Sequence, residues 1–441
     1  MLSRLKSRWL NMSQSLGFVP FVVAGLFAVL GIALVEFDSR LDLTGIKLVF
    51  TGDGSAARTV LSVIAGSLIT VAGLTFSITM VVLQLAASQF TPRILRTFFG
   101  DRLTQITIGT YVGIFIYSIL VLRAVGSLDQ HGFVPRLSVT VAALFSIAAV
   151  LLLVAFLHHV SKMVQVSEVS AQIARAGLGK IEQIYPRSPT DAPVPGSVAP
   201  EGKRDADAGT GPDKPPGFIF APRPGYVQRV SLPDLVKKLA GPAARAEVLI
   251  CPGDFVSSEQ PLVALWPAGA VPDCSAAVLA TITIASERDL DQDVAFALRQ
   301  LTDMALKAMS PGINDPMTAV TCIGYLRSML VMLAGRPDLP DRIHGDDGFV
   351  ALARRRSYTE FLESSLLQIN RYVGGDAWVC GEMLAALTAC AAAAAPGFAA
   401  RLRDIEQIGL AMSEQTLAQA GNARDRESIR ARRAELQRAC Q

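Results

Sequence analysis

The sequence predicts an all-α membrane domain with four transmembrane helices, followed by a soluble α+β cytoplasmic domain that has a small β-module and a helical C-terminal part. Three observations carry this prediction. Of the 441 residues, 51 % are hydrophobic and only 18 % are charged, whereas a typical soluble domain has about 25 % charged residues. Four long segments without a charged residue lie before residue 160. A stretch with eight prolines and four glycines then precedes a more polar second half.

The four uncharged segments are residues 18–35, 60–90, 106–122 and 137–157. A spanning helix needs roughly 20 apolar residues, so the second segment is over-long and is expected to tilt, kink or project beyond the hydrocarbon. Four spans place both termini on one side. With the termini inside, nine Lys and Arg flank the inner ends and five the outer ends, which predicts cytoplasmic termini. All six cysteines follow residue 250, and their spacing suits a reducing compartment.

The chain is expected to divide at changes in composition. A proline-rich segment that lacks large apolar residues cannot bury enough surface to order itself. We therefore expect a disordered linker over residues 186–216. The other expected parts are an N-terminal tail over 1–17, the transmembrane domain over 18–160, an amphipathic helical extension that continues the fourth span over 161–185, a β-rich module over 217–290 and a helical domain over 291–441.

Short apolar runs bounded by turn residues predict strands in the module, and longer runs of helical period predict helices after it. The expected strands are residues 218–221, 226–230, 247–251, 262–266 and 278–284. The expected helices are residues 291–309, 317–333, 358–372, 378–394, 397–418 and 424–438.

The second span carries a stripe of small and polar residues, in which many members recur every seven residues, or nearly two helical turns. Its members are Gly66, Thr70, Gly73, Ser77, Gln84, Ser88 and Thr91. Two alternatives stay open: the stripe packs closely against another helix, or it lines a pore or cavity. On the third span, the spacing of Gly109 and Gly113 predicts a packing face.

Arg93 and Arg96 follow the stripe and are expected at the cytoplasmic mouth of any such path. Their charge would raise the local concentration of anions, so a small ion, preferably an anion, is the expected permeant. No Asp, Glu, Lys or Arg lies inside a span. This argues against an ion-coupled transporter, which usually needs an ionisable residue in the membrane.

The second half offers two further clusters. The turn with Ser310, Asn314 and Asp315 is explained by helix capping, with a ligand-contacting loop as the alternative. Alternating acidic residues over 287–293 are explained by a charged helix start, with cation binding as the alternative. We find no motif for a nucleophile, a phosphate loop or a metal site, so we expect neither enzyme activity nor a cofactor. A net charge of +3 gives no reason to expect nucleic acid.

Two long strings, residues 73–93 and 305–316, resemble one family, with the acidic segment 287–293 placed before the second string. The order and spacing are similar over nearly the whole chain except the linker. The family is a bacterial family of predicted integral membrane proteins, domain of unknown function 2254. The resemblance implies a multi-pass protein of the bacterial inner membrane, and it brings no activity or site residue with it.

Taken together, these patterns predict a homo-oligomeric, channel-like or permeation protein in the lipid bilayer, with a cytoplasmic domain that gates or assembles it. The alternative is a membrane-anchored sensor or scaffold whose cytoplasmic domain binds a ligand or partner, without permeation. The orientation of the stripe on the second span discriminates between them.

Overall fold

The computed structural model describes residues 17–40, 49–89, 101–125, 133–163, 165–187, 215–239, 243, 245–344, 349–373, 375–394 and 398–441. Most of the expected linker, as well as Thr91, Arg93, Arg96 and the side chain of Ser88, lies outside the described residues. By its contacts, the chain divides into two compact units, Met1–Glu168 and Val169–Gln441.

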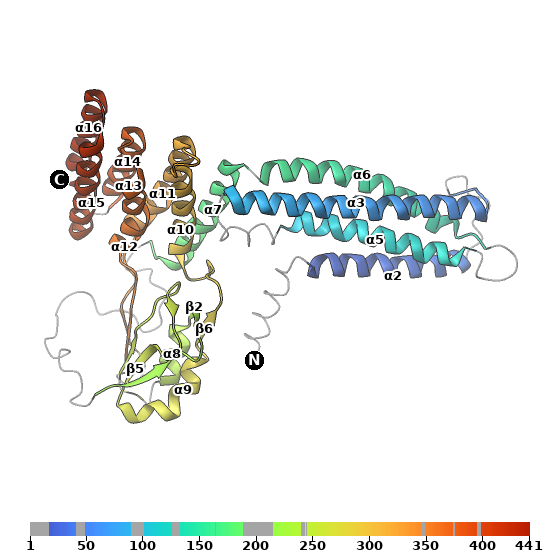
Figure 1. Cartoon of the computed structure of the whole chain (residues 1–441). Helices are drawn as coiled ribbons and strands as arrows, with labels where there is room; N and C mark the ends of the chain where they lie inside the picture. Colours follow the sequence, from blue (N-terminus) through green and yellow to red (C-terminus); the bar gives the residue numbers. More distant parts are fainter. Residues whose placement is uncertain are drawn as a thin grey trace. The chain divides into compact units, whose positions relative to one another are not determined.

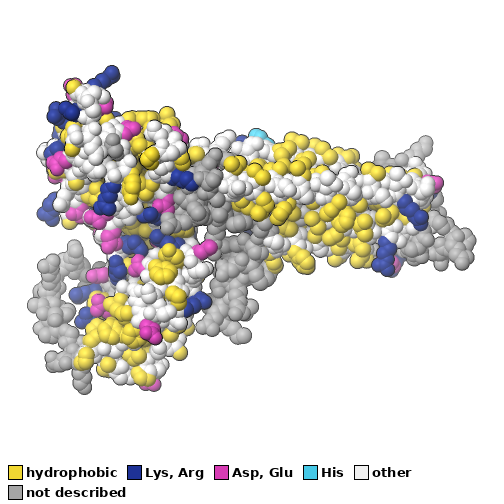
Figure 2. Space-filling model, in the orientation of Figure 1, with side chains coloured by type: hydrophobic (Ala, Val, Ile, Leu, Met, Phe, Trp, Pro, Cys, Tyr) yellow, Lys and Arg dark blue, Asp and Glu magenta, His cyan; other side chains and the backbone are white. Residues whose placement is uncertain are grey.

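The first unit consists of long helices that lie side by side: α2 (Phe18–Arg40), α3 (Gly54–Gln89), α5 (Arg102–Ala124) and α6 (Arg136–Met163) (Figure 1). On the face seen in Figure 2, hydrophobic side chains cover much of this unit. All four helices extend beyond the uncharged segments, because charge marks the edge of the hydrocarbon and not the end of backbone hydrogen bonding. At the end of α2, for example, Glu36 and Arg40 pair across one turn at 2.7 Å. The over-long second segment forms one continuous helix of 36 residues.

Helix α5 is the centre of this unit and contacts α2, α3 and α6. Its glycines bring it close to α2. A Cβ at Gly109 would lie 2.8 Å from the Cα of Pro20, and one at Gly113 would lie 2.5 Å from the ring of Phe27. The spacing of these glycines correctly predicts a packing face, since only a hydrogen side chain leaves room for such an approach.

Polar contacts join the helices at both ends of the bundle. Asp38, near the end of α2, accepts hydrogen bonds from the backbone N–H of Leu137 at 3.1 Å and of Ser138 at 2.8 Å. It thereby satisfies donors in the first turn of α6, which have no partner within the helix. At the other end, His159 Nε2 lies 3.0 Å from Asp101 Oδ1, and Asp101 also caps α5 through the N–H of Thr104.

The second unit begins at Val169, within α7 (Val166–Ile184), and then forms two sheets. The fourth span was expected to continue into this amphipathic segment, but α6 ends at Met163 and a separate helix starts at Val166. The larger sheet has the strand order β1-β5-β3-β8-β7, and the smaller one β4-β2-β6. The strands are β1 (Gly217–Phe220), β2 (Gly225–Val230), β3 (Arg245–Val248), β4 (Phe255–Val256), β5 (Pro261–Trp266), β6 (Ile282–Ala285), β7 (Arg342–His344) and β8 (Val350–Ala353).

Strands β7 and β8 were not predicted, although they complete the larger sheet. Strand β3 pairs in parallel with β8, in register from Arg245 opposite Val350 to Val248 opposite Ala353. Strands this short give no pattern by which to recognise them. The strand expected at 278–284 is partly wrong, because Val278 belongs to α9 (Val271–Leu279) and β6 starts at Ile282. A short apolar run does not distinguish a buried helix from a strand. Helix α8 (Leu232–Leu239) follows β2.

Helices make up the rest of the second unit, close to where the periodicity predicted them. They are α10 (Val294–Ala308), α11 (Pro316–Ala334), α12 (Tyr358–Leu362), a π-helical turn η6 (Glu363–Leu367), α13 (Gln368–Val373), α14 (Ala377–Ala393), α15 (Ala399–Gln419) and α16 (Ala423–Cys440). Two buried arginines join their ends. Arg336 donates to the carbonyl groups of Ile181 and Tyr185 at the end of α7. Arg401 donates to the carbonyl groups of Ala334 and Arg336.

By length and composition, five of the described helices could cross a membrane: α2, α3, α5, α6 and α11. The four expected spans are among these candidates, and α11 is a further candidate that was not expected. Helix α11 has 19 residues, and 44 % of its most apolar window is buried within the structure. Its hydropathy alone does not distinguish a spanning helix from a buried core helix.

The close approach of α5 to α2 yields a prediction. Gly109→Ala would force a methyl group against the backbone of Pro20, and we expect this overpacking to cost about 1–3 kcal/mol and to lower the thermal midpoint of the protein in detergent. Gly25→Ala on α2 is the matched control, because no atom lies within 4 Å of its Cβ position. Equal midpoints for the two variants would contradict the packing described here.

Candidate functional site

The described members of the α3 stripe lie on the face of the helix that points away from α2, α5 and α6. Gly66, Thr70, Gly73, Ser77 and Gln84 are all exposed. The residues that pack inside the unit fall on the opposite side of the helix, among them Leu61, Ala65, Leu68, Ala72 and Leu83. The stripe is therefore not the face that holds the four helices together within one subunit.

Hydrogen bonding differs along the stripe. The hydroxyl groups of Thr70 and Ser77 donate to the carbonyl oxygens of Gly66 and Gly73 at 2.9 and 3.0 Å, one turn earlier on the same helix. The amide of Gln84 makes no hydrogen bond to any described residue. Apart from the neighbouring backbone of α3 itself, no atom of the described residues lies within 4 Å of a Cβ placed at Gly66 or Gly73. The stripe is thus an open surface in which the amide of Gln84 has no hydrogen-bond partner among the described residues.

The turn at residues 310–315 joins α10 to α11 through local contacts. The Ser310 hydroxyl donates to the carbonyl oxygen of Lys307 at 2.7 Å, and Asn314 adopts a left-handed conformation with φ 48°. Asp315 accepts from the N–H of Thr318 at 3.1 Å and so caps α11. Capping accounts for Asp315, whereas Ser310 bonds within the turn and Asn314 gives it its left-handed conformation. Ligand contact by this turn stays a prediction.

The acidic residues of segment 287–293 take separate partners. Asp291 lies 3.1 Å from Lys180 Nζ, whereas Asp293 turns inward to Arg288. Within the described ranges, no group of three His, Cys, Asp or Glu side chains comes together as a metal site requires.

A pocket of about 400 Å³ lies in the second unit, where several elements converge. The end of α7, the start of α8, the amino end of α10, the loop before β7 and the segment between β8 and α12 all contribute to its wall. Four arginines line it: Arg229, Arg354, Arg355 and Arg356. Apolar lining comes from Ile184, Leu232, Val294, Leu339, Ile343 and Phe361.

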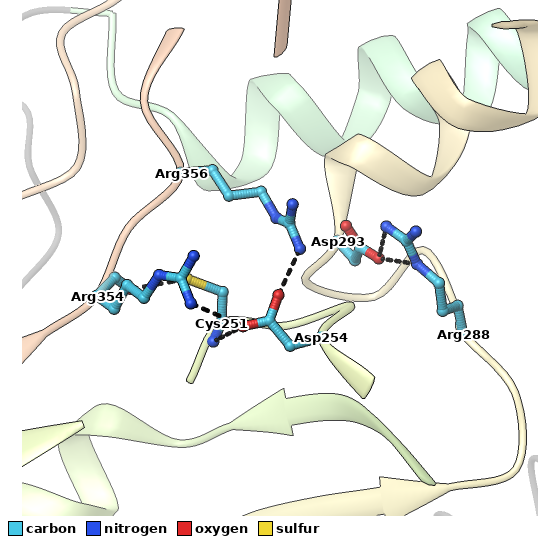
Figure 3. A network of polar contacts seen from close by, with 6 residues as sticks. All are labelled: Cys251, Asp254, Arg288, Asp293, Arg354 and Arg356. Atoms are coloured by element: carbon cyan, nitrogen blue, oxygen red, sulfur yellow. Dashed lines mark hydrogen bonds and ion pairs between the residues drawn. The ribbon is translucent and has the colours of Figure 1, made fainter. Parts of the chain in front are cut away.

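Parallel pairing of β3 and β8 brings two loops together at one edge of the pocket (Figure 3). Asp254, in the loop after β3, accepts from Arg356 Nη2 at 2.7 Å and lies 3.6 Å from Arg354 Nη1. The same carboxylate also accepts from the backbone N–H of Cys251 at 2.9 Å. Burial raises the pKa of the Cys251 thiol to about 11, so at neutral pH this side chain is a thiol. It donates to the carbonyl oxygen of Arg354 at 3.2 Å.

Asp293 lies at the amino end of α10. Its side chain is 2 % exposed, and one carboxylate oxygen pairs with Arg288 at 2.6 Å. The second oxygen, Oδ1, has no hydrogen-bond partner among the described residues, and it lies on the side of Asp293 that faces Arg356 in Figure 3. Burial raises the pKa of Asp293, and the charge of Arg288 opposes this shift.

The remaining two arginines of the pocket have no ion pair among the described residues. Arg355 Nε donates to the carbonyl oxygen of Pro340 at 3.3 Å, and burial lowers the pKa of its guanidinium group. Arg229 is exposed at the end of β2. The four arginines were not singled out in the sequence, and Asp293 was noted only as part of the acidic segment 287–293. The signal available was three consecutive arginines after a short apolar run, but the contribution of Arg229, Asp254 and Asp293 follows only from the fold.

Comparison with known proteins agrees with the membrane character of the helices. The chain is similar to uncharacterized proteins of Mycobacterium bovis and Mycobacterium tuberculosis, with 32 % identity over 377 residues, or 83 % of this chain and 69 % of each relative. No solved structure matches the chain significantly. The sequence profile of the family described as "Predicted membrane protein (DUF2254)" matches residues 13–389. The chain therefore belongs to this family of predicted membrane proteins.

Proposed function

We propose that this protein is a homo-oligomeric, non-enzymatic permeation protein of the bacterial inner membrane, in which the exposed stripe of α3 meets other copies of the chain around a path for small anions. The observation that carries the proposal is the orientation of the stripe. Gly66, Thr70, Gly73, Ser77 and Gln84 point away from their own subunit. The hydroxyl groups of Thr70 and Ser77 bond within α3, so it is the amide of Gln84 and the small residues around it that favour a partner outside the subunit.

Lipid is a poor partner for this surface. The amide of Gln84 has two donors and an acceptor oxygen, and a polar group without a partner in hydrocarbon is costly. Neighbouring residues such as Leu74, Phe76 and Val81 are also exposed, by 54 %, 47 % and 56 %, but their side chains suit lipid. The contrast between the stripe and its flanks supports a specific contact or a water path at the stripe.

The glycines of the stripe support a second copy of this chain as that contact. Gly66 and Gly73 leave open space where side chains would stand, and small residues allow helices to approach closely in membranes. Copies of one chain generally assemble in closed symmetric rings or pairs. The same stripe then faces a common axis in each copy, which is the arrangement that a pore requires.

We propose that four helices span the membrane and that α11 stays in the core of the cytoplasmic unit. Arg327 lies near the middle of α11, where a charged residue in a spanning helix is expensive. Helix α11 also contacts α10 and α14, and the buried hydroxyl group of Ser170 on α7 lies 3.8 Å from the sulfur of Cys322. An even number of spans places both termini on the same side of the membrane, and the excess of Lys and Arg at the expected inner ends favours the cytoplasm.

The alternative, a membrane-anchored sensor without permeation, is favoured by a different observation. The arginine-lined pocket in the second unit has the size and the mixture of apolar and charged walls that are typical of ligand sites. The two functions can be distinguished by experiment. Ligand binding in the absence of ion flux would support the sensor and contradict permeation.

The number of spans determines where the C-terminus lies. With four spans, green fluorescent protein fused after Gln441 is expected to fluoresce and alkaline phosphatase at the same position to be inactive, because the first folds in the cytoplasm and the second outside it. Insertion of each reporter between α5 and α6 is the internal control and is expected to give the opposite result. Full phosphatase activity after Gln441 would contradict the four-span topology and favour five spans.

Disulfide cross-linking tests whether the stripe meets a second copy. In membranes treated with a mild oxidant, Ser77→Cys is expected to form covalent dimers rapidly. Leu151→Cys on α6 is the matched control, because that residue is 68 % exposed but lies outside the stripe. The unmodified chain sets the background, since its described cysteines are buried or half-buried. Equal dimer yields for the two variants would reject an interface at the stripe.

Flux measurements test the path itself. In liposomes that contain the purified protein, we expect chloride flux that Gln84→Leu lowers several-fold, because an apolar side chain promotes drying of a narrow pore. Leu74→Ile on the same helix is the matched control and is expected to leave the flux unchanged. An absence of flux through the wild-type protein would refute the permeation proposal.

A further inference from the structure

We propose that the arginine-lined pocket of the second unit binds a phosphate monoester whose organic part carries a hydroxyl group. This proposal does not depend on permeation, because all of the residues that line the pocket belong to Val169–Gln441. It rests on the charge of the pocket, on one unsatisfied carboxylate oxygen and on the apolar wall.

The pocket holds more positive than negative charge. Arg354 and Arg356 share the single carboxylate of Asp254, while Arg229 and Arg355 have no ion pair among the described residues. Asp293 is neutralised by Arg288. Arg355 is half-buried, and Asp341 acts on its guanidinium group electrostatically without forming an ion pair. A half-buried guanidinium group without a close counter-charge favours an anion. A phosphate monoester carries a charge of about −1.5 to −2 at neutral pH, and guanidinium groups bind its oxygens in a fork geometry.

The amino end of α10 adds to this preference. Asp293, Val294 and Ala295 line the pocket, and the side chain of Asp293 does not cap the helix. In the first turn of this 15-residue helix, the N–H of Phe296 donates to the backbone carbonyl oxygen of Asp293 at 3.0 Å and acts against the rise in the pKa of the Asp293 carboxyl group that burial causes. The N–H groups of Val294 and Ala295 have no side-chain acceptor among the described residues. Such N–H groups favour an anion through both hydrogen bonding and the helix dipole.

The unsatisfied oxygen of Asp293 specifies a second feature of the ligand. Oδ1 is buried, has no partner among the residues described, and belongs to a side chain that lines the pocket. A buried acceptor without a donor is costly. A hydroxyl group of the ligand supplies the donor, while the phosphate remains with the arginines. The Nε of Arg356 is also unpaired within the described part of the chain, which leaves it available to a phosphate oxygen.

The volume of the pocket and its apolar wall indicate the size and character of the organic part of the ligand. About 400 Å³ lies within the range of roughly 300–1,000 Å³ that is typical of small-molecule sites. Ile184, Leu339 and Phe361 contribute apolar surface against which a carbon skeleton can pack. The same chemistry is found in soluble phosphate monoesters and in the headgroup of a lipid phosphate monoester, and the experiment must distinguish these two sources.

Isothermal titration calorimetry of the full-length protein in detergent tests the proposal with four probes: adenosine monophosphate, glycerol 3-phosphate, water-soluble dioctanoyl phosphatidic acid, and adenosine as the probe without phosphate. We expect at least one phosphate monoester to bind and adenosine not to bind. Arg355→Gln is expected to weaken the binding about tenfold or more, through loss of a charge-assisted contact. Arg229→Gln, at an exposed position, provides a second variant in case the first is poorly folded.

Arg430→Gln is the matched control, because Arg430 is exposed on α16 and does not line the pocket. Tighter binding of dioctanoyl phosphatidic acid than of the soluble esters would support the proposal with a lipid as the source of the phosphate. Tighter binding of the soluble esters would support the proposal with a soluble metabolite as the source. Binding that Arg355→Gln and Arg229→Gln leave unchanged, or no binding of any phosphate monoester, would overturn it. Neither result affects the permeation proposal, which is tested by flux and by cross-linking.

Discussion

The second unit depends on the parallel pairing of β3 with β8, two short strands that are far apart in the sequence. The pairing places the loop after β3 beside the segment after β8, and Asp254 can then contact Arg356, 102 residues further along the chain. Strand β8 also closes the sheet with β7. Without this pairing, the three consecutive arginines would follow an unattached segment, and no pocket would form between them and α10.

In the described part of the chain, carboxylates do not balance all the positive charges of the pocket arginines. Arg336 and Arg401 show how the same unit treats a buried guanidinium group that serves structure, because each donates to several carbonyl oxygens at helix ends. Arg401 also pairs with Asp338 at 2.6 Å. Arg355 has one long hydrogen bond to Pro340 and no ion pair in the described part of the chain. The contrast separates arginines that hold the fold together from an arginine that is available to a ligand.

In the first unit, the constraint is that one helix must satisfy two environments. Helix α3 packs its apolar face, including Leu61, Leu68 and Leu83, inside the unit and turns its small and polar residues outward. A helix on the surface of a soluble protein has the same pattern, because water meets its polar face. In a membrane the outer face meets lipid, where a polar side chain without a partner is unfavourable. Gly109 and Gly113 of α5 serve the contact with α2 within the subunit, whereas Gly66 and Gly73 of α3 face open space among the described residues.

The sequence by itself determined the membrane character, the four N-terminal helices, most of the later helices and the family, because long apolar runs and helical periodicity are local properties. It also identified the polar stripe on α3, but only the tertiary structure decided that the stripe faces outward, since that depends on which side α5 and α6 occupy. The pocket could not be read from the sequence. Its residues come from β2, the loop after β3, α10 and the segment after β8, and the long-range strand pairing that joins them leaves no periodic signal in strands of four residues.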